Sequence, residues 1–277
     1  MRRHRKLISK RKYTAPFAIW IVAGTVIPIL TIAYYGITNR SGAFTFENIT
    51  AMFNSQHLEA LAMSLLLSVV STVVCLVLAF PMALILRESR FGKQGFMIFV
   101  FILPMWMNFL LRTMAWQVLL ERQGVINSVL TSIGLNRQEM MGTPGAVVLG
   151  MVYDFLPFMV LPIYNVVSKI DNRLIEAAYD LGAGKFYVFR RVIFPLSIPG
   201  IASGVTMVFI PALTTFVISN MLGGGKVNLI GNIIEQEFTV NSNWYLGSGL
   251  SLVMMVFIIV SMLIVQKFGD GEEDHLL

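Results

Sequence analysis

The sequence predicts an all-α polytopic membrane protein with six transmembrane helices, and three observations support this fold class. Of the 277 residues, 56% are hydrophobic and only 13% are charged, and the mean hydropathy of +0.73 lies outside the range of a soluble domain. The apolar residues gather into six segments, each of which is long enough to cross a bilayer. Lipid offers no partner to backbone N–H and C=O groups, so segments that cross it are helical.

Each of the six segments supports one span, because crossing the hydrocarbon core takes about 20 mostly apolar residues. The first, second, fifth and sixth segments contain no Asp, Glu, Lys or Arg. The third contains one such residue, Arg112, and the fourth contains one, Asp154. In order along the chain, the predicted spans are 16–38, 61–86, 95–120, 145–168, 196–222 and 247–265.

The distribution of Lys and Arg between the spans predicts which connections lie in the cytoplasm, because cytoplasmic loops carry an excess of these residues. Sixteen of the 21 lie in segments 1–15, 87–94, 169–195 and 266–277, whereas the alternate loops hold four and Arg112 is the last. Both termini and the loop 169–195 are therefore predicted to be cytoplasmic, in a multi-pass protein of the cell (plasma) membrane.

The domain organisation is predicted to be simple, with one membrane domain over residues 16–265. A basic cytoplasmic N-terminus precedes it over 1–15, and a cytoplasmic tail follows over 266–277. We attribute the net charge of +6 to this topology, since basic residues beside anionic lipid headgroups each contribute on the order of 1 kcal/mol to attachment. Membrane lipid is thus an expected partner, and nucleic acid is not.

The cysteine and histidine content argues against a disulfide or a metal site. The single cysteine, Cys75, lies in the middle of the second predicted span, so no disulfide can form within the chain. The three histidines, His4, His57 and His275, lie outside the spans and far apart in sequence. We therefore expect no metal ligands on this chain.

The cytoplasmic loop between the fourth and fifth spans carries the most informative local pattern. Asp171 or Asn172 is suited to cap the start of a short helix, and Gly182 is suited to end it. Between these signals, apolar side chains recur at three- and four-residue spacing and form one small face. Glu176 and Asp180 lie four residues apart on another face, where basic groups of a partner would meet them. The apolar face consists of Leu174, Ala177, Ala178 and Leu181.

The same loop resembles the "EAA" loop of ABC-importer permeases, the element that docks into the ATPase subunit. The family pattern reads Glu-Ala-Ala, three residues, Gly, nine residues and then Ile-x-Leu-Pro. Here Val192 and Phe194 replace the Ile and the Leu by other apolar residues. The positions that stand in register are Glu176, Ala177, Ala178, Gly182 and Pro195.

This resemblance implies the type I ABC-importer permease fold, also called MetI-like, and a defined set of partners. The partners are a second similar permease, a dimer of ABC ATPase subunits and an extracytoplasmic substrate-binding protein. The resemblance also implies that the loop helix couples ATP hydrolysis on the ATPase to transport. The residues to which this coupling role is carried over are Glu176, Ala177, Ala178, Asp180 and Gly182.

The chain itself is not expected to hydrolyse ATP. The Gly184-Lys185 pair near this loop is followed by Phe186, and Tyr179 stands where the first glycine of a phosphate-binding loop belongs. That fails the phosphate-cradling requirement at two positions. ATP and Mg²⁺ are therefore expected on the partner ATPase and no cofactor on this chain, which makes it a transport subunit and not an enzyme.

Two charged residues lie at membrane depth, and an ionisable residue there is by default a candidate functional site. At 1.5 Å per residue, Arg112 lies roughly 6 Å and Asp154 roughly 4 Å to the outer side of the middle of their spans. Two interpretations stay open at this point. Either the two residues form a structural ion pair, or Asp154 faces the translocation path and offers a carboxylate to a cationic substrate.

Neighbouring side chains support the second interpretation. Asn108, Arg112 and Trp116 are spaced by four residues and are predicted to form one polar and aromatic stripe. Phe158 shares a helix face with Asp154, and an aromatic ring near a carboxylate suits an ammonium group through cation–π attraction. The candidate residues of a substrate path are Asp154, Phe158, Trp106, Asn108, Arg112, Trp116 and Asn220.

Beyond the loop, roughly residues 15 to 265 resemble the permeases of spermidine/putrescine importers. That branch has an acid where Asn220 stands in this chain. The resemblance implies uptake of polyamines into the cytoplasm. An ABC importer for another small solute is the first alternative, and a stand-alone channel or secondary transporter is the second. The stretches that carry the likeness are 103–112, 152–162, 211–224 and 229–234.

Overall fold

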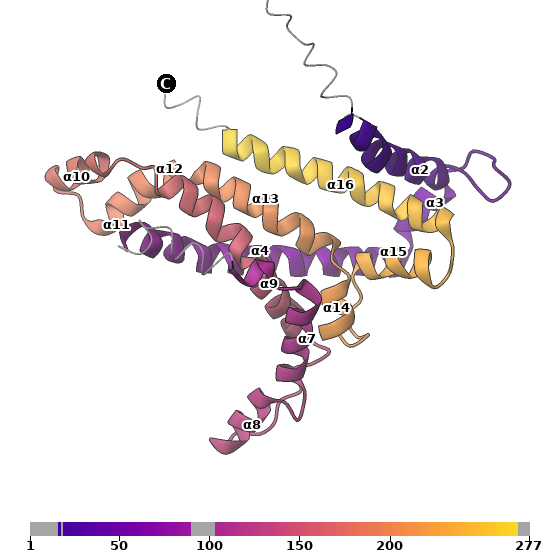
Figure 1. Cartoon of the computed structure of the whole chain (residues 1–277), viewed down its shortest axis with the longest axis horizontal. Helices are drawn as coiled ribbons and strands as arrows, with labels where there is room; N and C mark the ends of the chain where they lie inside the picture. The colour runs from indigo at the N-terminus through magenta and orange to yellow at the C-terminus, as the bar shows by residue number, and fades with distance from the viewer. Residues whose placement is uncertain (1–15, 18, 90–102, 271–277) are drawn as a thin grey trace, which may run out of the picture. The chain divides into compact units, whose positions relative to one another are not determined.

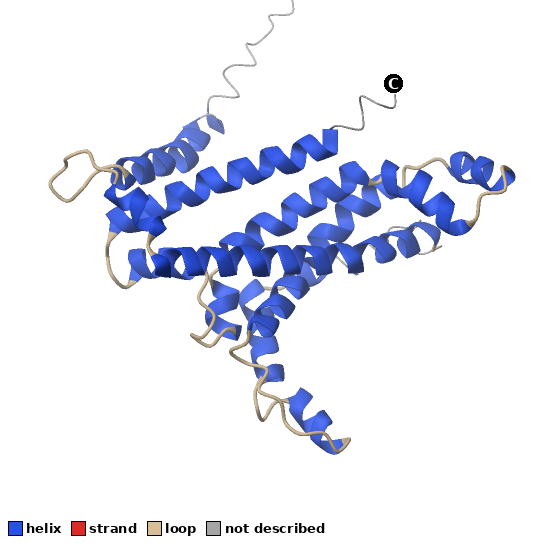
Figure 2. Ribbon diagram, turned by 180° about the vertical axis from the view of Figure 1, so that it is seen from behind, coloured by secondary structure: helices blue, strands red, loops and turns tan. Residues whose placement is uncertain are grey.

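The structure is a computed structural model of the chain and describes residues 16–17, 19–89 and 103–270. Within these ranges the backbone is helical and forms no strand beyond one isolated bridge between Thr38 and Phe44 (Figure 2). The predicted all-α class is therefore confirmed. The predicted basic N-terminus and the last seven residues of the predicted tail lie outside the described residues.

Two compact units make up the fold, and each is described by itself. In the first unit, the helix Ile19–Gly36 is long enough to cross a membrane. It contains a π-helical turn η1 (Val22–Val26) and α2 (Ile27–Gly36), and it runs beside the first half of α16 (Trp244–Asp270) (Figure 1). The ring of Tyr35 packs on that of Tyr245, with centroids 5.3 Å apart. The two units are Met1–Asn54 with Ile234–Val256, and Ser55–Ile233 with Phe257–Leu277.

Short elements close the first unit. Helix α3 (Glu47–Thr50) leads into the 3-10 turn η2 (Ala51–Phe53). The Asn48 side chain on α3 donates from Nδ2 to the backbone oxygen of Thr38 at 2.9 Å and to that of Gly36 at 3.3 Å. These bonds satisfy carbonyl groups that are left without helical partners where α2 ends.

The core of the second unit is a packed trio of long helices: α4 (Ser55–Glu88), α9 (Pro144–Val167) and α13 (Ile198–Thr214) lie side by side (Figure 1). A Cβ on Gly204 of α13 would lie 2.7 Å from Met159 Sδ of α9, so the missing side chain lets these two helices approach closely. Buried residues from all three helices fill the space between them; they include Cys75, Ala79, Ala83, Met159, Val160, Ile163 and Val208.

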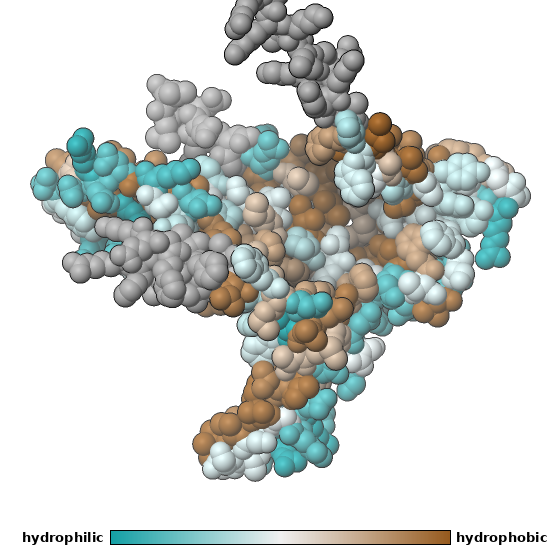
Figure 3. Space-filling model, in the orientation of Figure 1, coloured by the Kyte–Doolittle hydropathy of each residue, from teal (hydrophilic) through white to brown (hydrophobic). Residues whose placement is uncertain are grey.

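A smaller arm of the second unit contains α7 (Phe109–Leu120) and α8 (Val125–Ser132). The buried Asn127 side chain holds the arm's return loop, because its Nδ2 donates to Glu121 O at 3.1 Å and to Gln138 O at 3.0 Å. Figure 3 shows apolar residues gathered along α8. The exposed apolar side chains of α8 and the loop after it are Val125, Val129, Ile133 and Leu135.

Four of the six predicted spans are confirmed as single helices that are long and apolar enough to cross a membrane. They correspond to the first, second, fourth and sixth predicted segments. Their ends differ from the prediction by a few residues, as expected for boundaries read from hydropathy. The four helices are Ile19–Gly36, Ser55–Glu88, Pro144–Val167 and Trp244–Lys267.

The third predicted span is not one helix in the part that the structure describes. Its residues 95–102 lie outside the described residues. The rest consists of a 3-10 turn η3 (Leu103–Trp106) and α7, which are separated by two residues. Asn108 has extended backbone angles and caps α7, because its Oδ1 accepts from Leu110 N at 2.8 Å. The helix therefore starts afresh within the predicted span.

The fifth predicted span, 196–222, begins close to the start of α13 at Ile198 but extends past the end of that helix. The spanning helix α13 ends at Thr214, and α14 (Val217–Leu222) is a separate short helix. At the other end, helix Lys185–Leu196 continues the path of α13 after a bend of 64°. Pro199 explains this bend, because it has no N–H to donate to the carbonyl four residues earlier. The bent pair raises the number of candidate spans among the described residues from four to five.

Tertiary contacts explain the break between α13 and α14. Thr215 is extended, and the nearby helix α15 (Ile230–Thr239) lies close enough that a Cβ on Gly231 would be 2.7 Å from Thr214 O. Asn232 Nδ2 donates to Phe216 O at 3.0 Å. Phe216 O also accepts from Asn220 N at 2.9 Å, so Asn232 fixes the backbone at the start of α14.

Candidate functional site

The loop helix predicted between the fourth and fifth spans is present as α10 (Asn172–Asp180). Asp171 is its N-cap, and its Oδ1 accepts from Arg173 N at 3.0 Å. Asn172, the other predicted cap, instead accepts from Arg87 Nη2 at 2.7 Å through Oδ1. Arg87 also donates to Ile170 O at 3.0 Å, so the end of α4 fixes the start of α10.

Gly182 ends this helix as predicted. Its φ of +84° lies in the left-handed region, which residues with a Cβ rarely adopt. Gly182 N donates to Tyr179 O at 2.8 Å, and Ala183 N donates to Ala178 O at 3.1 Å. These two bonds form a Schellman motif, which satisfies the last helical carbonyls and turns the chain toward the next helix, Lys185–Val188.

The surface of α10 is exposed and mixed in character. Glu176 and Asp180 are exposed, and polar residues gather over this helix (Figure 3). Leu181 is 89% exposed, although it belongs to the predicted apolar face. A shallow cavity of about 420 Å³ follows the end of the helix. Its lining residues are Ala178, Leu181, Gly182, Ala183, Gly184 and Tyr187. The loop thus presents one exposed apolar side chain, Leu181, and a shallow cavity beside the carboxylates of Glu176 and Asp180.

A buried charge pair joins α7 to α9. Arg112 Nε lies 3.4 Å from Asp154 Oδ1, and the two side chains are 7% and 2% exposed. Thr113 Oγ1 lies 3.2 Å from Asp154 Oδ2 and 3.1 Å from Phe109 O, and these two acceptors share its single proton. On its other side, the Arg112 guanidinium carbon lies 6.0 Å from the centroid of the Tyr153 ring, within the range of a cation–π contact.

The pair borders a cavity of about 540 Å³. The walls come from η3, α7, α9 and the break between α13 and α14. Among the residues that line it, Arg112 and Asp154 carry the ionisable side chains, and four phenylalanine rings form much of the remainder. The full lining is Met105, Met107, Phe109, Arg112, Asp154, Phe155, Phe158, Pro211, Thr214, Thr215, Phe216 and Val217.

The hydrogen bonding of this pair is incomplete. Arg112 Nε, Arg112 Nη1 and Asp154 Oδ1 are buried, and no described residue gives any of them a hydrogen-bond partner. Buried polar atoms nearly always have partners, so three orphaned atoms beside one cavity mark a place where a ligand or a rearrangement can complete the bonding.

Comparison with known proteins identifies the family. Residues 62–270 match the model of the binding-protein-dependent transport system inner membrane component. The chain belongs to this family. It is therefore a multi-pass membrane subunit of a binding-protein-dependent transport system.

Two relatives of this inner membrane component cover most of it. The spermidine/putrescine transport system permease protein PotB of Haemophilus influenzae is 37% identical over 86% of this chain and 86% of its own length. The protein of the same name in Escherichia coli is 35% identical over 88% of this chain and 92% of its own length.

Solved structures show that the fold is the one that the loop motif implies. A bacterial ABC transporter that imports the acidic polysaccharide alginate superposes with a TM-score of 0.79 at 18% identity, covering 95% of this chain and 96% of that one. The methionine ABC transporter MetNI, in an inward-facing form, gives a TM-score of 0.53 at 18% identity, covering 79% and 95%. The type I, MetI-like permease fold is thus confirmed.

The structure divides six of the seven predicted path residues of this inner membrane component into three groups. Arg112, Asp154 and Phe158 come together at the larger cavity. Asn108 is the cap of α7, and Trp106 on η3 is 76% exposed. Asn220 lies away from the cavity lining, where its Oδ1 accepts from Asn232 Nδ2 at 2.6 Å.

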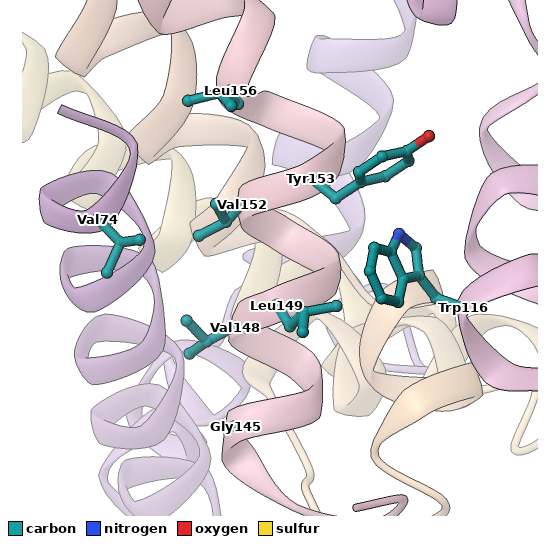
Figure 4. Close-up of a pocket in the computed structure, with 8 residues that line it drawn as sticks. All are labelled: Val74, Trp116, Gly145, Val148, Leu149, Val152, Tyr153 and Leu156. Carbon is teal, nitrogen blue, oxygen red and sulfur yellow. The ribbon is translucent and has the colours of Figure 1, made fainter. Parts of the chain in front are cut away.

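The predicted stripe of Asn108, Arg112 and Trp116 does not act as one surface. Trp116 packs edge-on against Tyr153, with ring centroids 5.4 Å apart, and lines a separate apolar cavity of about 420 Å³ (Figure 4). Across that cavity, Val74 of α4 faces Val148 and Val152 of α9 (Figure 4). The stripe divides for two reasons. Asn108 precedes α7, and each step of four residues along the helix, as from Arg112 to Trp116, rotates the side chain by about 40° around the helix axis.

Sequence reasoning missed three residues that shape the site. Thr113 fixes the carboxylate of Asp154, Tyr153 faces the guanidinium of Arg112, and Asn232 holds the break that lines the cavity. Thr113 and Tyr153 each stand directly beside a charged residue in the sequence, which is a signal that inspection could have used. Asn232 carries no such signal, since its role depends on contacts with residues 216 to 220.

Proposed function

We propose that this inner membrane component is the permease subunit of an ATP-driven importer that carries polyamines, such as spermidine and putrescine, into the cytoplasm. The observation that carries the proposal is the likeness, at 35–37% identity over most of the chain, to permeases named for spermidine and putrescine transport. The chemistry of the larger cavity supports the same substrate class.

A polyamine is a flexible aliphatic chain with ammonium groups, and the cavity offers surfaces for both parts. Asp154 presents a buried carboxylate oxygen without a hydrogen-bond donor among the described residues. Phe109, Phe155 and Phe158 supply apolar area for methylene groups and ring faces for ammonium groups. A purely neutral solute would gain little from this combination.

Energy for transport comes, in this proposal, from a dimer of ABC ATPase subunits that binds ATP and Mg²⁺. The exposed helix α10 supports this assignment, because Glu176, Ala177 and Asp180 lie on its outer surface and Gly182 fixes the turn that follows. A second permease and an extracytoplasmic binding protein complete the assembly. Both termini and α10 lie on the cytoplasmic side, as the Lys and Arg distribution predicts.

Reconstitution tests the proposal directly. The permease is co-expressed with its genetic neighbours, the assembly is placed in lipid nanodiscs, and ATP hydrolysis is measured with the binding protein loaded with candidate solutes. Spermidine or putrescine should stimulate hydrolysis well above the rate with an amino acid, a sugar or an iron chelate. Stimulation by one of those solutes and not by polyamines would overturn the substrate assignment. Polyamine uptake by this chain without an ATPase would overturn the ATP-driven mechanism.

A further inference from the structure

Arg112 stands where a substrate cation would stand. We propose that its guanidinium acts as a tethered counter-ion, which neutralises Asp154 between transport events and yields this position to a substrate ammonium group. The inference rests on the proposed function, because it takes a cationic substrate as given. It assigns to Arg112 a role in substrate release that a fixed structural ion pair would not have.

The pair is close but weakly bonded. A strong arginine–carboxylate pair is commonly bidentate, with two parallel N–H···O bonds. Here the Nε–Oδ1 distance of 3.4 Å satisfies an ion pair, but neither Nε nor Nη1 makes a hydrogen bond with any described residue. Such a pair has gained charge neutralisation without the directional bonds that would lock it. A compact ammonium group with three donors can therefore compete for Oδ1.

The carboxylate keeps its orientation when Arg112 leaves. Thr113 Oγ1 lies 3.2 Å from Asp154 Oδ2, and the side chain of Asp154, which belongs to α9, is buried. This bond uses Oδ2 and leaves Oδ1 for the cation. The site for an ammonium group is thus preorganised by Thr113, and exchanging one cation for another does not require the acceptor to move.

The Tyr153 ring offers the displaced Arg112 guanidinium a second contact. The Arg112 Cζ is already 6.0 Å from the Tyr153 ring centroid, and Tyr153 is the neighbour of Asp154 on the same helix. A cation over an aromatic face is stabilised by the ring quadrupole. Arg112 can therefore shift from Oδ1 to the ring face while its positive charge stays stabilised.

Exchange of this kind solves an electrostatic problem of release. A polyamine that leaves a buried carboxylate exposes an uncompensated charge, which is strongly unfavourable at membrane depth. When the tethered guanidinium returns to Oδ1, that charge is neutralised at once. The substrate is consequently bound less tightly and released faster than it would be without Arg112.

The test measures equilibrium binding of radiolabelled putrescine to the whole transporter in nanodiscs, without the binding protein. In Arg112→Gln the internal competitor is gone, and putrescine should bind at least about fivefold tighter, since the competent fraction of the site rises. The maximal rate of uptake should fall in the same variant. The double variant Arg112→Gln with Asp154→Asn should lose the gain in binding. Arg122→Gln is the matched control, because its exposed partner Glu139 lies 3.7 Å away and outside the cavity.

A second pair of variants decides the matter if Arg112→Gln does not assemble. Tyr153→Leu removes the ring that receives the displaced guanidinium and should weaken putrescine binding severalfold, whereas Tyr153→Phe keeps the ring and should bind as the wild type does. Equal binding by these two variants would overturn the proposal. So would an assembled Arg112→Gln complex that binds putrescine no tighter than the wild type.

These outcomes are distinct from a failure of the proposed function. If polyamines stimulate ATP hydrolysis by the wild-type complex but Arg112→Gln shows no gain in affinity, the tethered counter-ion alone is refuted. If polyamines do not stimulate the wild-type complex and another solute does, the proposed substrate class is refuted and this inference with it.

Discussion

Arg112 on α7 and Asp154 on α9 meet in the interior of the protein with 3.4 Å between Nε and Oδ1, and neither atom has a hydrogen-bond partner among the described residues. The structure thus shows the ion pair between the third and fourth predicted spans, which was one of the two interpretations of the sequence. The pair lies at the wall of a cavity, which also keeps the carboxylate available to a substrate.

Variants of Asp154 and Arg112 should show that the stability of the protein and its transport activity depend on the pair in different ways. Asp154→Asn leaves Arg112 buried without a counter-charge, so we expect a loss of about 3–5 kcal/mol in the free energy of unfolding, together with a loss of polyamine uptake. Adding Arg112→Gln removes the stranded charge and should restore most of the stability but not uptake. Thermal melting of the purified complex and uptake into proteoliposomes measure the two effects. Restored uptake in the double variant would show that neither charge takes part in transport.

The left-handed turn at Gly182 should be sensitive to any side chain. Gly182→Val places a β-branched residue at a φ of +84°, which costs about 1–2 kcal/mol and favours fraying of the last turn of α10. Since about 1.4 kcal/mol is tenfold in an equilibrium, we expect a fall of roughly tenfold in substrate-stimulated ATP hydrolysis.

Gly184→Ala is the control for this change. Gly184 has a φ of −74° and no atom within 4 Å of the position of an added Cβ, so ATP hydrolysis should be unaffected. Equal activity of Gly182→Val and wild type would argue against a role for the turn in coupling.

Charge reversal on the exposed surface of α10 should affect coupling without affecting the fold. Glu176 is exposed, so Glu176→Lys should change the free energy of unfolding by no more than about 0.5 kcal/mol. Co-purification of the ATPase subunit and stimulated ATP hydrolysis should nevertheless drop. Glu139→Lys reverses an exposed charge in the arm that carries α8 and should leave both unchanged. Normal ATPase binding by Glu176→Lys would place the docking surface elsewhere.

The backbone break beside the cavity should depend on Asn232. Its Oδ1 accepts from the buried Leu229 N at 2.9 Å, so Asn232→Ala leaves that N–H without a partner and should lower the free energy of unfolding by about 1–3 kcal/mol. Asn220→Ala removes only an exposed acceptor of the Asn232 amide and should lower the free energy of unfolding less.

Thermal melting compares the stability of the two variants. Uptake by the Asn220→Ala variant tests the predicted place of Asn220 on the substrate path. Equal destabilisation by both variants would contradict this account of the break.

Hydropathy and local signals were sufficient for much of the fold. Four spans are single helices because long apolar runs without charges form helices in lipid whatever their neighbours are. The bounds of α10 also followed from nearby residues, since the cap at Asp171 and the left-handed turn at Gly182 act within one helical turn.

The fifth span shows where local reasoning ends. Its 27 predicted residues include no Asp, Glu, Lys or Arg, and hydropathy cannot distinguish one long helix from two separated by a break. The break at Thr215 persists because Gly231 and Asn232, about 16 residues further along the chain, come close enough for Gly231 to pack against it and for Asn232 to donate to Phe216 O.

The sequence by itself determined the family fold, four of the six predicted spans and the helix that carries the Glu-Ala-Ala motif, because each depends on composition or on neighbours in the chain. Only the tertiary structure decided that Arg112 meets Asp154 while Trp116 faces another cavity. Periodicity tells which residues share a face of a helix, but the rotation and tilt of each helix depend on how all of its neighbours pack. The chemistry of the site follows from that packing.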